Sequence, residues 1–153
     1  MLRFVWRFPR VRGGWPKYEY IKPWLADLAL ATVFDIGVNY GQFLHLAKRL
    51  WPQATIVGVE PNADLAAKAT GFYTNDGKIR VESCAVGAED GEIEFFVTAN
   101  DQNSSIYAPS DAFHDDREQD GVVRTEKVPL KRLDGLLSGC AGPMLLKEDV
   151  QRA

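Results

Sequence analysis

The chain has 153 residues, of which 46% are hydrophobic and 25% are charged, and its formal net charge is -3. This length and composition suit one hydrophobic core of ordinary size, and no apolar run reaches the roughly 18 residues that a membrane span needs. The acidic balance argues against a nucleic-acid surface, which normally needs a concentrated basic excess.

Residues 1–31 are predicted to form an N-terminal arm and a helix. Arginines alternate with aromatic and apolar residues at the start of this segment, and the helix is expected near residues 23–31. No uninterrupted apolar stretch of the roughly 7 to 15 residues typical of a signal peptide follows the arginines. A solvated or docking arm is therefore predicted, with contact to an anionic partner as the alternative.

The most informative segment is a strand followed by two glycines and a helix. Residues 32–36 are predicted to form a buried strand, and residues 43–50 carry the 3.6-residue apolar period of a helix. Gly37 and Gly41 lie between them and allow the backbone to come close to a ligand. A strand, a glycine turn and a helix open a Rossmann-like α/β unit, so a ligand that carries a nucleoside is predicted.

The spacing of this turn discriminates between nucleotides. A dinucleotide fingerprint beginning at Gly37 needs glycine at positions 39 and 42, where the chain has Asn39 and Gln42. The Gly-Lys-Ser/Thr sequence of a phosphate-binding P-loop is absent. Asp35, at the end of the strand, suits a cationic ligand such as S-adenosylmethionine and would repel a pyrophosphate.

A second apolar strand, over residues 54–60, ends in an acidic residue. In nucleotide-binding α/β folds an Asp or Glu at this position accepts hydrogen bonds from the ribose hydroxyls, so Glu60 is the predicted ribose ligand. Pro61 turns the chain after it. The helix predicted over residues 63–70 is expected to be capped by Asn62.

A third strand is predicted over residues 78–87. Its end is expected to pass near an adenine, because Ser83 and Ala85 are small enough to let a flat base approach. Ordinary packing explains such small residues equally well. A further strand is predicted over residues 91–97, followed by an acidic loop over 111–120, and Asp134 is predicted to cap a short turn over 135–137.

From about residue 30 onward the chain resembles FkbM-family methyltransferases. Five motifs fall in the order typical of that family: Val33-Phe34-Asp35-Ile36-Gly37-x-Asn39-x-Gly41, Val59-Glu60-Pro61-Asn62, Ala85-Val86-Gly87, Leu133-Asp134 and Leu146-Lys147-x-Asp149-Val150-Gln151. The resemblance implies a Rossmann-like class I methyltransferase fold, with a parallel-rich sheet and flanking helices. It also implies O-methylation of a saccharide or another small molecule that carries a hydroxyl group.

The resemblance assigns roles residue by residue. Asp35, Gly37, Asn39 and Gly41 would line the methionine part of S-adenosylmethionine, Glu60 would bind its ribose, and Asp149 would lie at the catalytic edge of the last strand. Residues 32–153 are accordingly predicted to form a partial S-adenosylmethionine-binding domain.

The last motif departs from the family pattern. Glu148 and Arg152 replace the usual Ile and Gly, and the sequence ends at Ala153. The prediction is a domain whose C-terminal strands are missing, with Glu148 on a face that packs under helices. A non-catalytic, nucleoside-binding remnant of such an enzyme is the alternative to an active methyltransferase.

Asp149 and Lys147 are the candidate catalytic residues. Asp149 is the better candidate for the base that removes the acceptor's hydroxyl proton, ahead of His114. Lys147 could instead hold Asp149 ionised, which would make the pair structural.

Neither a metal site nor a disulfide framework is predicted. The two histidines have no cysteine or carboxylate cluster at ligand spacing, and two cysteines are too few for a disulfide framework. A cytoplasmic protein is therefore expected, with a small-molecule or glycan acceptor as its partner.

Overall fold

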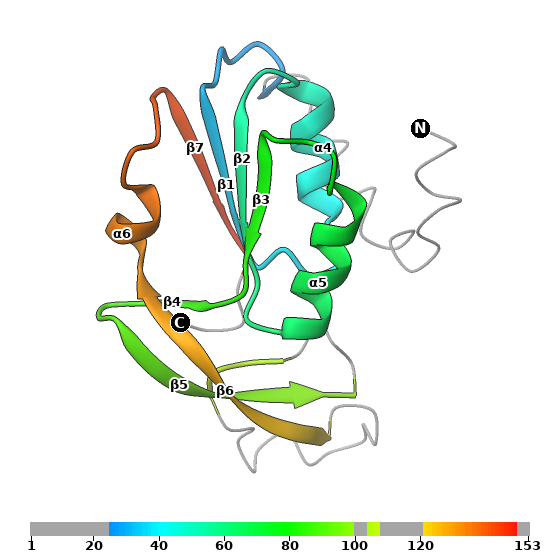
Figure 1. Cartoon of the computed structure of the whole chain (residues 1–153), viewed down its shortest axis with the longest axis vertical. Helices are drawn as coiled ribbons and strands as arrows, with labels where there is room; N and C mark the ends of the chain where they lie inside the picture. The colour runs from blue at the N-terminus through cyan, green and yellow to red at the C-terminus, as the bar shows by residue number, and fades with distance from the viewer. Residues whose placement is uncertain (1–24, 100–103, 108–120, 150–153) are drawn as a thin grey trace.

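The computed structural model describes residues 25–99, 104–107 and 121–149, which form two sheets and three helices (Figure 1). The first sheet has the order β3-β2-β1-β7 and the second has the order β4-β6-β5. The strands are β1 (Thr32–Ile36), β2 (Thr55–Val59), β3 (Ile79–Glu82), β4 (Ala85–Gly87), β5 (Gly91–Thr98), β6 (Val122–Arg132) and β7 (Met144–Glu148), and the helices are α4 (Gln42–Leu50), α5 (Ala63–Phe72) and α6 (Leu133–Leu137). The predicted α/β class and parallel-rich sheet are confirmed.

All strand pairs of the first sheet are parallel, so the four strands end at one common edge. The chain runs from β1 outward through β2 to β3 and later returns to the other side of β1 as β7. Strand order therefore reverses at β1. Ligands of open α/β sheets bind outside the carboxyl ends of the strands at such a reversal. Figure 1 shows that these ends point toward the second sheet.

Helices cover both faces of the first sheet. α4 and α5 lie on one face, where Val33 and Ile56 pack against Phe43, Leu44 and Leu46 in the main core. α6 lies on the opposite face, and its Leu136 belongs to a second cluster with Phe34 and Val57. Strand residues alternate between the two faces, which is why neighbours such as Val33 and Phe34 enter different cores.

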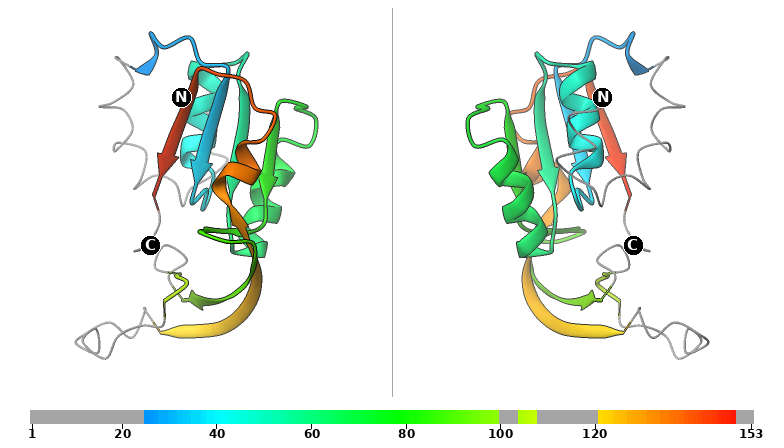
Figure 2. Two further views of the ribbon diagram at one scale, coloured as in Figure 1. Left: turned by 90° about the vertical axis from the view of Figure 1, so that its left-hand side faces the viewer. Right: turned by 90° about the vertical axis from the view of Figure 1, so that its right-hand side faces the viewer.

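The second sheet corrects the prediction of one long strand over residues 78–87. The chain leaves the first sheet after Glu82 and joins the second at Ala85, which pairs with Leu130 of β6. Cys84, between the two strands, is fully buried among Phe34 and Val57. That burial anchors the crossing from one sheet to the other, and Figure 2 shows the second sheet at one end of the first.

Two further local predictions have opposite outcomes. The Asn62 cap is confirmed, because its side chain accepts hydrogen bonds from the amides of Asp64 and Leu65 at 3.1 and 3.3 Å. The Asp134 cap is wrong: Arg132 occupies the N-cap position of α6, and Asp134 lies in the first turn, where its carboxylate binds the Arg132 guanidinium.

The ends of the described chain also differ from expectation. The helix predicted near residues 23–31 does not continue to residue 31, since residues 28–31 have no helical structure. Glu148 does not pack under a helix, because β7 exposes Met144, Leu146 and Glu148 on one face. α6 has five residues and covers the centre of that face only. The N-terminal arm and the whole acidic loop over 111–120, including the alternative base His114, lie outside the described residues.

Gly58 provides a test of the main core. A Cβ atom at this position would lie 2.6 Å from Cγ2 of Val38 and 3.3 Å from Cδ1 of Leu44. Gly58→Ala is expected to lower the free energy of unfolding by about 1–3 kcal/mol, as overpacked cores do. Urea denaturation followed by circular dichroism measures this loss.

Gly71 of α5 is the matched control. A Cβ atom there meets nothing within 4 Å, so Gly71→Ala is expected to raise the free energy of unfolding, by about 0.5–1 kcal/mol through helix propensity. Equal effects of the two substitutions would contradict the packing assigned to Gly58.

Candidate active site

The glycine turn after β1 has the backbone that its sequence predicts. Gly37, Asn39 and Gly41 have φ angles of 80°, 51° and 81°. Glycine adopts this left-handed region without strain, and asparagine tolerates it better than most residues. The amide of Gly37 donates to the Val59 carbonyl at 2.9 Å, so the turn is fastened to the end of β2.

Glu60 fixes the turn from the side of β2. Its Oε2 accepts a hydrogen bond from the Asn39 amide at 2.7 Å, and its Oε1 accepts one from the Asn62 amide at 2.9 Å. The residue is 5% exposed. A carboxylate offers about four acceptor positions. Each oxygen of Glu60 therefore keeps capacity for another donor, such as a hydroxyl group.

Asp35 and Lys147 fix the turn from the side of β7. The two residues are register partners on adjacent parallel strands, and Nζ of Lys147 lies 2.8 Å from Oδ1 of Asp35. The side chain of Asp35 is 0% exposed and that of Lys147 is 15% exposed. This is a buried ion pair beneath the turn and beside α4.

Lys147 connects this buried pair to the surface of the sheet edge. Its ammonium donates to the Gly37 carbonyl at 3.1 Å and lies 5.8 Å from the centre of the Phe43 ring. Oδ2 of Asp149 lies 4.0 Å from the same nitrogen, and the Asp149 side chain is 49% exposed. The Asp149 amide donates to the Ile36 carbonyl, which holds the end of β7 beside the turn.

The electrostatics of this edge are acidic. Burial raises the pKa of Asp35 above its usual range, although the Lys147 ammonium opposes the shift. Burial also raises the pKa of Glu60, although the amides of Asn39 and Asn62 lower it, and the Asp35 charge adds to the increase. The carboxyl groups of Asp35 and Asp149 thus lie within 4.0 Å of one ammonium, and that of Glu60 supports the other side of the same turn.

Among the residues that it describes, the structure brings together all but two of the predicted site residues. Asp35, Gly37, Asn39, Gly41, Glu60, Lys147 and Asp149 meet around the carboxyl ends of β1, β2 and β7. Ser83 follows β3 and is exposed. Ala85 is 4% exposed and belongs to β4, in the core of the second sheet with Phe95 and Val128. An adenine role for Ser83 and Ala85 stays a prediction.

Sequence reasoning missed two contributors. The backbone amide of Asn62 orients Glu60, whereas the sequence indicated only the capping role of the Asn62 side chain. Phe43 lies over Lys147, and its apolar helix position indicated core packing alone. The direction of the Asn62 amide and the position of the Phe43 ring depend on the tertiary fold. Only the Glu60-Pro61-Asn62 spacing could have indicated one of these contacts from the sequence.

Two kinds of feature are absent from the described parts of the chain. Within residues 25–99, 104–107 and 121–149, no group of three or more His, Cys, Asp or Glu side chains could hold a metal ion. Among the same residues, no helix is long and apolar enough to cross a membrane.

The family comparison agrees with this geometry. The family model described as the methyltransferase FkbM domain matches residues 35–152, from the aspartate of the glycine turn to beyond β7. The chain therefore belongs to the FkbM methyltransferase family. No curated protein matches the chain.

Lys147→Met tests the buried ion pair. Removing the ammonium leaves the Asp35 carboxylate buried without compensation, so we expect a loss of about 3–5 kcal/mol in the free energy of unfolding at neutral pH. The loss should shrink as the pH falls. The aspartate of the unfolded chain titrates near about 3.9, and the pKa of Asp35 in the folded variant lies above this value. The folded variant therefore binds more protons than the unfolded chain, so its free energy of unfolding falls as the pH rises above about 3.9. Denaturation at several pH values measures both effects.

Two variants control this test. Lys48→Met also breaks an ion pair, to Asp76, but both side chains are partly exposed, and the expected loss is at most about 1 kcal/mol. Asp35→Asn combined with Lys147→Met should recover part of the loss, because no buried charge remains. Equal losses for Lys147→Met and Lys48→Met would show that the Asp35 pair is not a buried one.

Proposed function

We propose that this chain is an S-adenosylmethionine-dependent methyltransferase that methylates a hydroxyl group of a saccharide or secondary metabolite. Membership of the FkbM family supports methyl transfer. The observation that carries the choice of donor is the acidic edge of the sheet, where three carboxyl groups and one ammonium meet at the glycine turn.

This edge suits the proposed donor in charge and in shape. The excess of carboxyl groups favours a ligand with ammonium and sulfonium charges over a dinucleotide with a pyrophosphate. A Cβ atom on Gly41 would meet nothing within 4 Å, which leaves space beside the turn. Glu60 keeps acceptor positions that fit the two ribose hydroxyls.

The roles of the residues follow from these contacts. The turn of Gly37, Asn39 and Gly41 would bind the methionine part of the donor and Glu60 its ribose, while Ser83 and Ala85 are proposed on the adenine side. The donor supplies a methyl group activated by a positively charged sulfur. Asp149 would accept the proton of the acceptor hydroxyl, and Lys147 would hold the turn in place through its hydrogen bond to the Gly37 carbonyl. Positioning supplies most of the acceleration in such a displacement.

Two broader inferences belong to the same proposal. An active enzyme is favoured over a non-catalytic remnant because the chain belongs to a methyltransferase family and the proposed base, Asp149, lies beside the glycine turn. A cytoplasmic location is proposed because Cys84 and Cys140 are both free thiols.

Calorimetric titration tests the donor. The parent chain is expected to bind S-adenosylmethionine and not NADH. Glu60→Gln should weaken donor binding about tenfold or more, since a charge-assisted hydrogen bond to a hydroxyl is lost. Glu94→Gln, an exposed acid on β5, is the matched control and should bind as the parent does. Preference for NADH would refute the proposal.

Asp149→Asn tests the proposed base. In a labelled-methyl assay with a panel of saccharides, the turnover rate is expected to fall about 10²- to 10⁴-fold, as loss of a general base does. Donor affinity should fall far less than the turnover rate, because the substitution removes one of the three carboxyl groups but leaves Glu60 and the glycine turn intact. A variant that turns over at the parental rate would exclude Asp149 as the base.

A further inference from the structure

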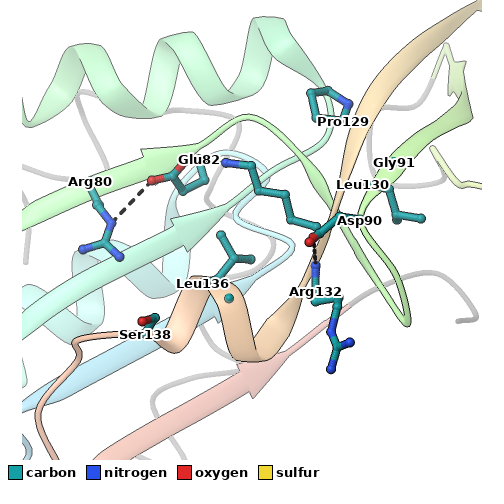
Figure 3. Close-up of a pocket in the computed structure, with 11 residues that line it drawn as sticks. Arg80, Glu82, Asp90, Gly91, Pro129, Leu130, Arg132, Leu136 and Ser138 are labelled. Carbon is teal, nitrogen blue, oxygen red and sulfur yellow. Dashed lines mark hydrogen bonds and ion pairs between the residues drawn. The ribbon is translucent and has the colours of Figure 1, made fainter.

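A hollow of about 580 Å³ lies on the α6 side of the first sheet. Its walls come from β3, the turn between β4 and β5, β6, and the segment of α6 and Ser138 (Figure 3). The volume falls in the range of small-molecule sites. None of the residues proposed to bind the methyl donor lines it, so its function must be argued from its own side chains.

Two cations in this hollow share one carboxylate. Nε of Arg80 lies 3.4 Å from Oε1 of Glu82, and Nζ of Lys131 lies 3.3 Å from Oε2 of the same residue. Both separations exceed the roughly 2.7–2.9 Å of a strong charge-assisted bond. A guanidinium and an ammonium together offer eight N–H donors, far more than Glu82 accepts.

The other charged groups of the hollow are gathered around Arg132. Arg132 is bound through two contacts to Asp134, at 3.0 and 2.7 Å, and Figure 3 shows its guanidinium pointing away from Glu82. Asp90 accepts a hydrogen bond from the Arg132 amide at 2.8 Å. Arg80 and Lys131 together therefore carry one positive charge more than Glu82 balances, while Asp90 keeps its negative charge on the Arg132 side of the hollow. The side chains of Arg80 and Lys131 are 46% and 45% exposed.

An apolar surface lies next to these cations. Leu136 is directed into the hollow from α6, and Leu130 and Pro129 contribute from β6 (Figure 3). The Ser138 hydroxyl lies at the rim. An excess of cationic donors beside a small apolar wall suits a ligand with an anionic group at one end and an apolar body at the other.

We propose that this hollow binds a small organic anion, a carboxylate or a phosphate monoester, whose charged group bridges Arg80 and Lys131 and whose apolar part lies against Leu136. Glu82 occupies the position of that group when the ligand is absent. The inference goes beyond methyl transfer and does not depend on it. The two sites adjoin, because the Glu60 amide donates to the Glu82 carbonyl at 3.0 Å.

The test is a titration of the ¹⁵N-labelled full chain, followed by two-dimensional NMR at low ionic strength. Benzyl phosphate and benzoate are the two probes, and they distinguish a phosphate from a carboxylate ligand. At least one of them is expected to give saturable shifts of the Arg80, Lys131 and Leu136 amides that weaken as salt is added. Benzyl alcohol, with the same apolar body and no charge, should give none.

Variants locate the binding. Arg80→Gln and Lys131→Gln should each weaken the preferred probe about tenfold, the loss expected for a charge-assisted hydrogen bond. Lys127→Gln removes the same charge from an exposed position of β6 outside the hollow and should bind as the parent does. Glu82→Gln removes the internal competitor and should tighten binding.

Three results would overturn the proposal: equal weakening by Lys127→Gln and Arg80→Gln, weaker binding by Glu82→Gln, or no saturable shift at the hollow with either anion. The spectrum of each variant also shows whether it is folded. Calorimetry of Arg80→Gln with S-adenosylmethionine keeps the two sites separate, because this variant should bind the donor as the parent chain does.

Discussion

The buried ion pair between Asp35 and Lys147 is the constraint on which the edge of the sheet depends. An unpaired carboxylate beneath α4 would be expensive to bury, so β7 must lie beside β1 with Lys147 opposite Asp35. The same ammonium donates to the carbonyl of Gly37, 110 positions away in sequence. The shape of the glycine turn is thus completed by the last described strand.

Glu60 has a corresponding function on the other side of the turn. Its two oxygens hold the amides of Asn39 and Asn62, so the turn after β1 and the start of α5 have a common anchor. The turn therefore lies between an acid on β2 and a lysine on β7. Such a two-sided support is what a preorganised ligand site needs, because the groups that would meet the ligand are already held by their neighbours.

Sequence patterns predicted the parts of this arrangement that depend on short-range order. The apolar strand before Gly37, the apolar period of α4 and the Asn62 cap each follow from residues close in the chain, and each is found. The pairing of Asp35 with Lys147 was not predicted, because it depends on which strands become neighbours. From the sequence, Lys147 was paired only with Asp149, which is two residues away.

The two errors have different origins. The segment over residues 78–87 has the apolar content of one strand, and only the burial of Cys84 between two sheets divides it. The sequence places Asp134 directly before a short turn over 135–137, as a capping residue, but α6 already begins at Leu133 and Arg132 binds the Asp134 carboxylate. In the first case a tertiary contact outweighs a local preference, and in the second a contact between residues two positions apart does so.

The short length of α6 decides what the rest of the sheet can bind. Its five residues cover Phe34, Val57 and Val59 at the centre of one face and leave both margins open. On the β7 margin, Met144 and Leu146 stay nearly half exposed. On the β3 margin, the chain has Arg80 and Glu82 in place of apolar residues. Both side chains reach water there, so they can keep their charges without a desolvation cost. The same sheet therefore forms both sites. The hollow beside β3 lies on the face that α6 leaves partly uncovered, and the acidic edge at the glycine turn lies at the carboxyl ends of the strands.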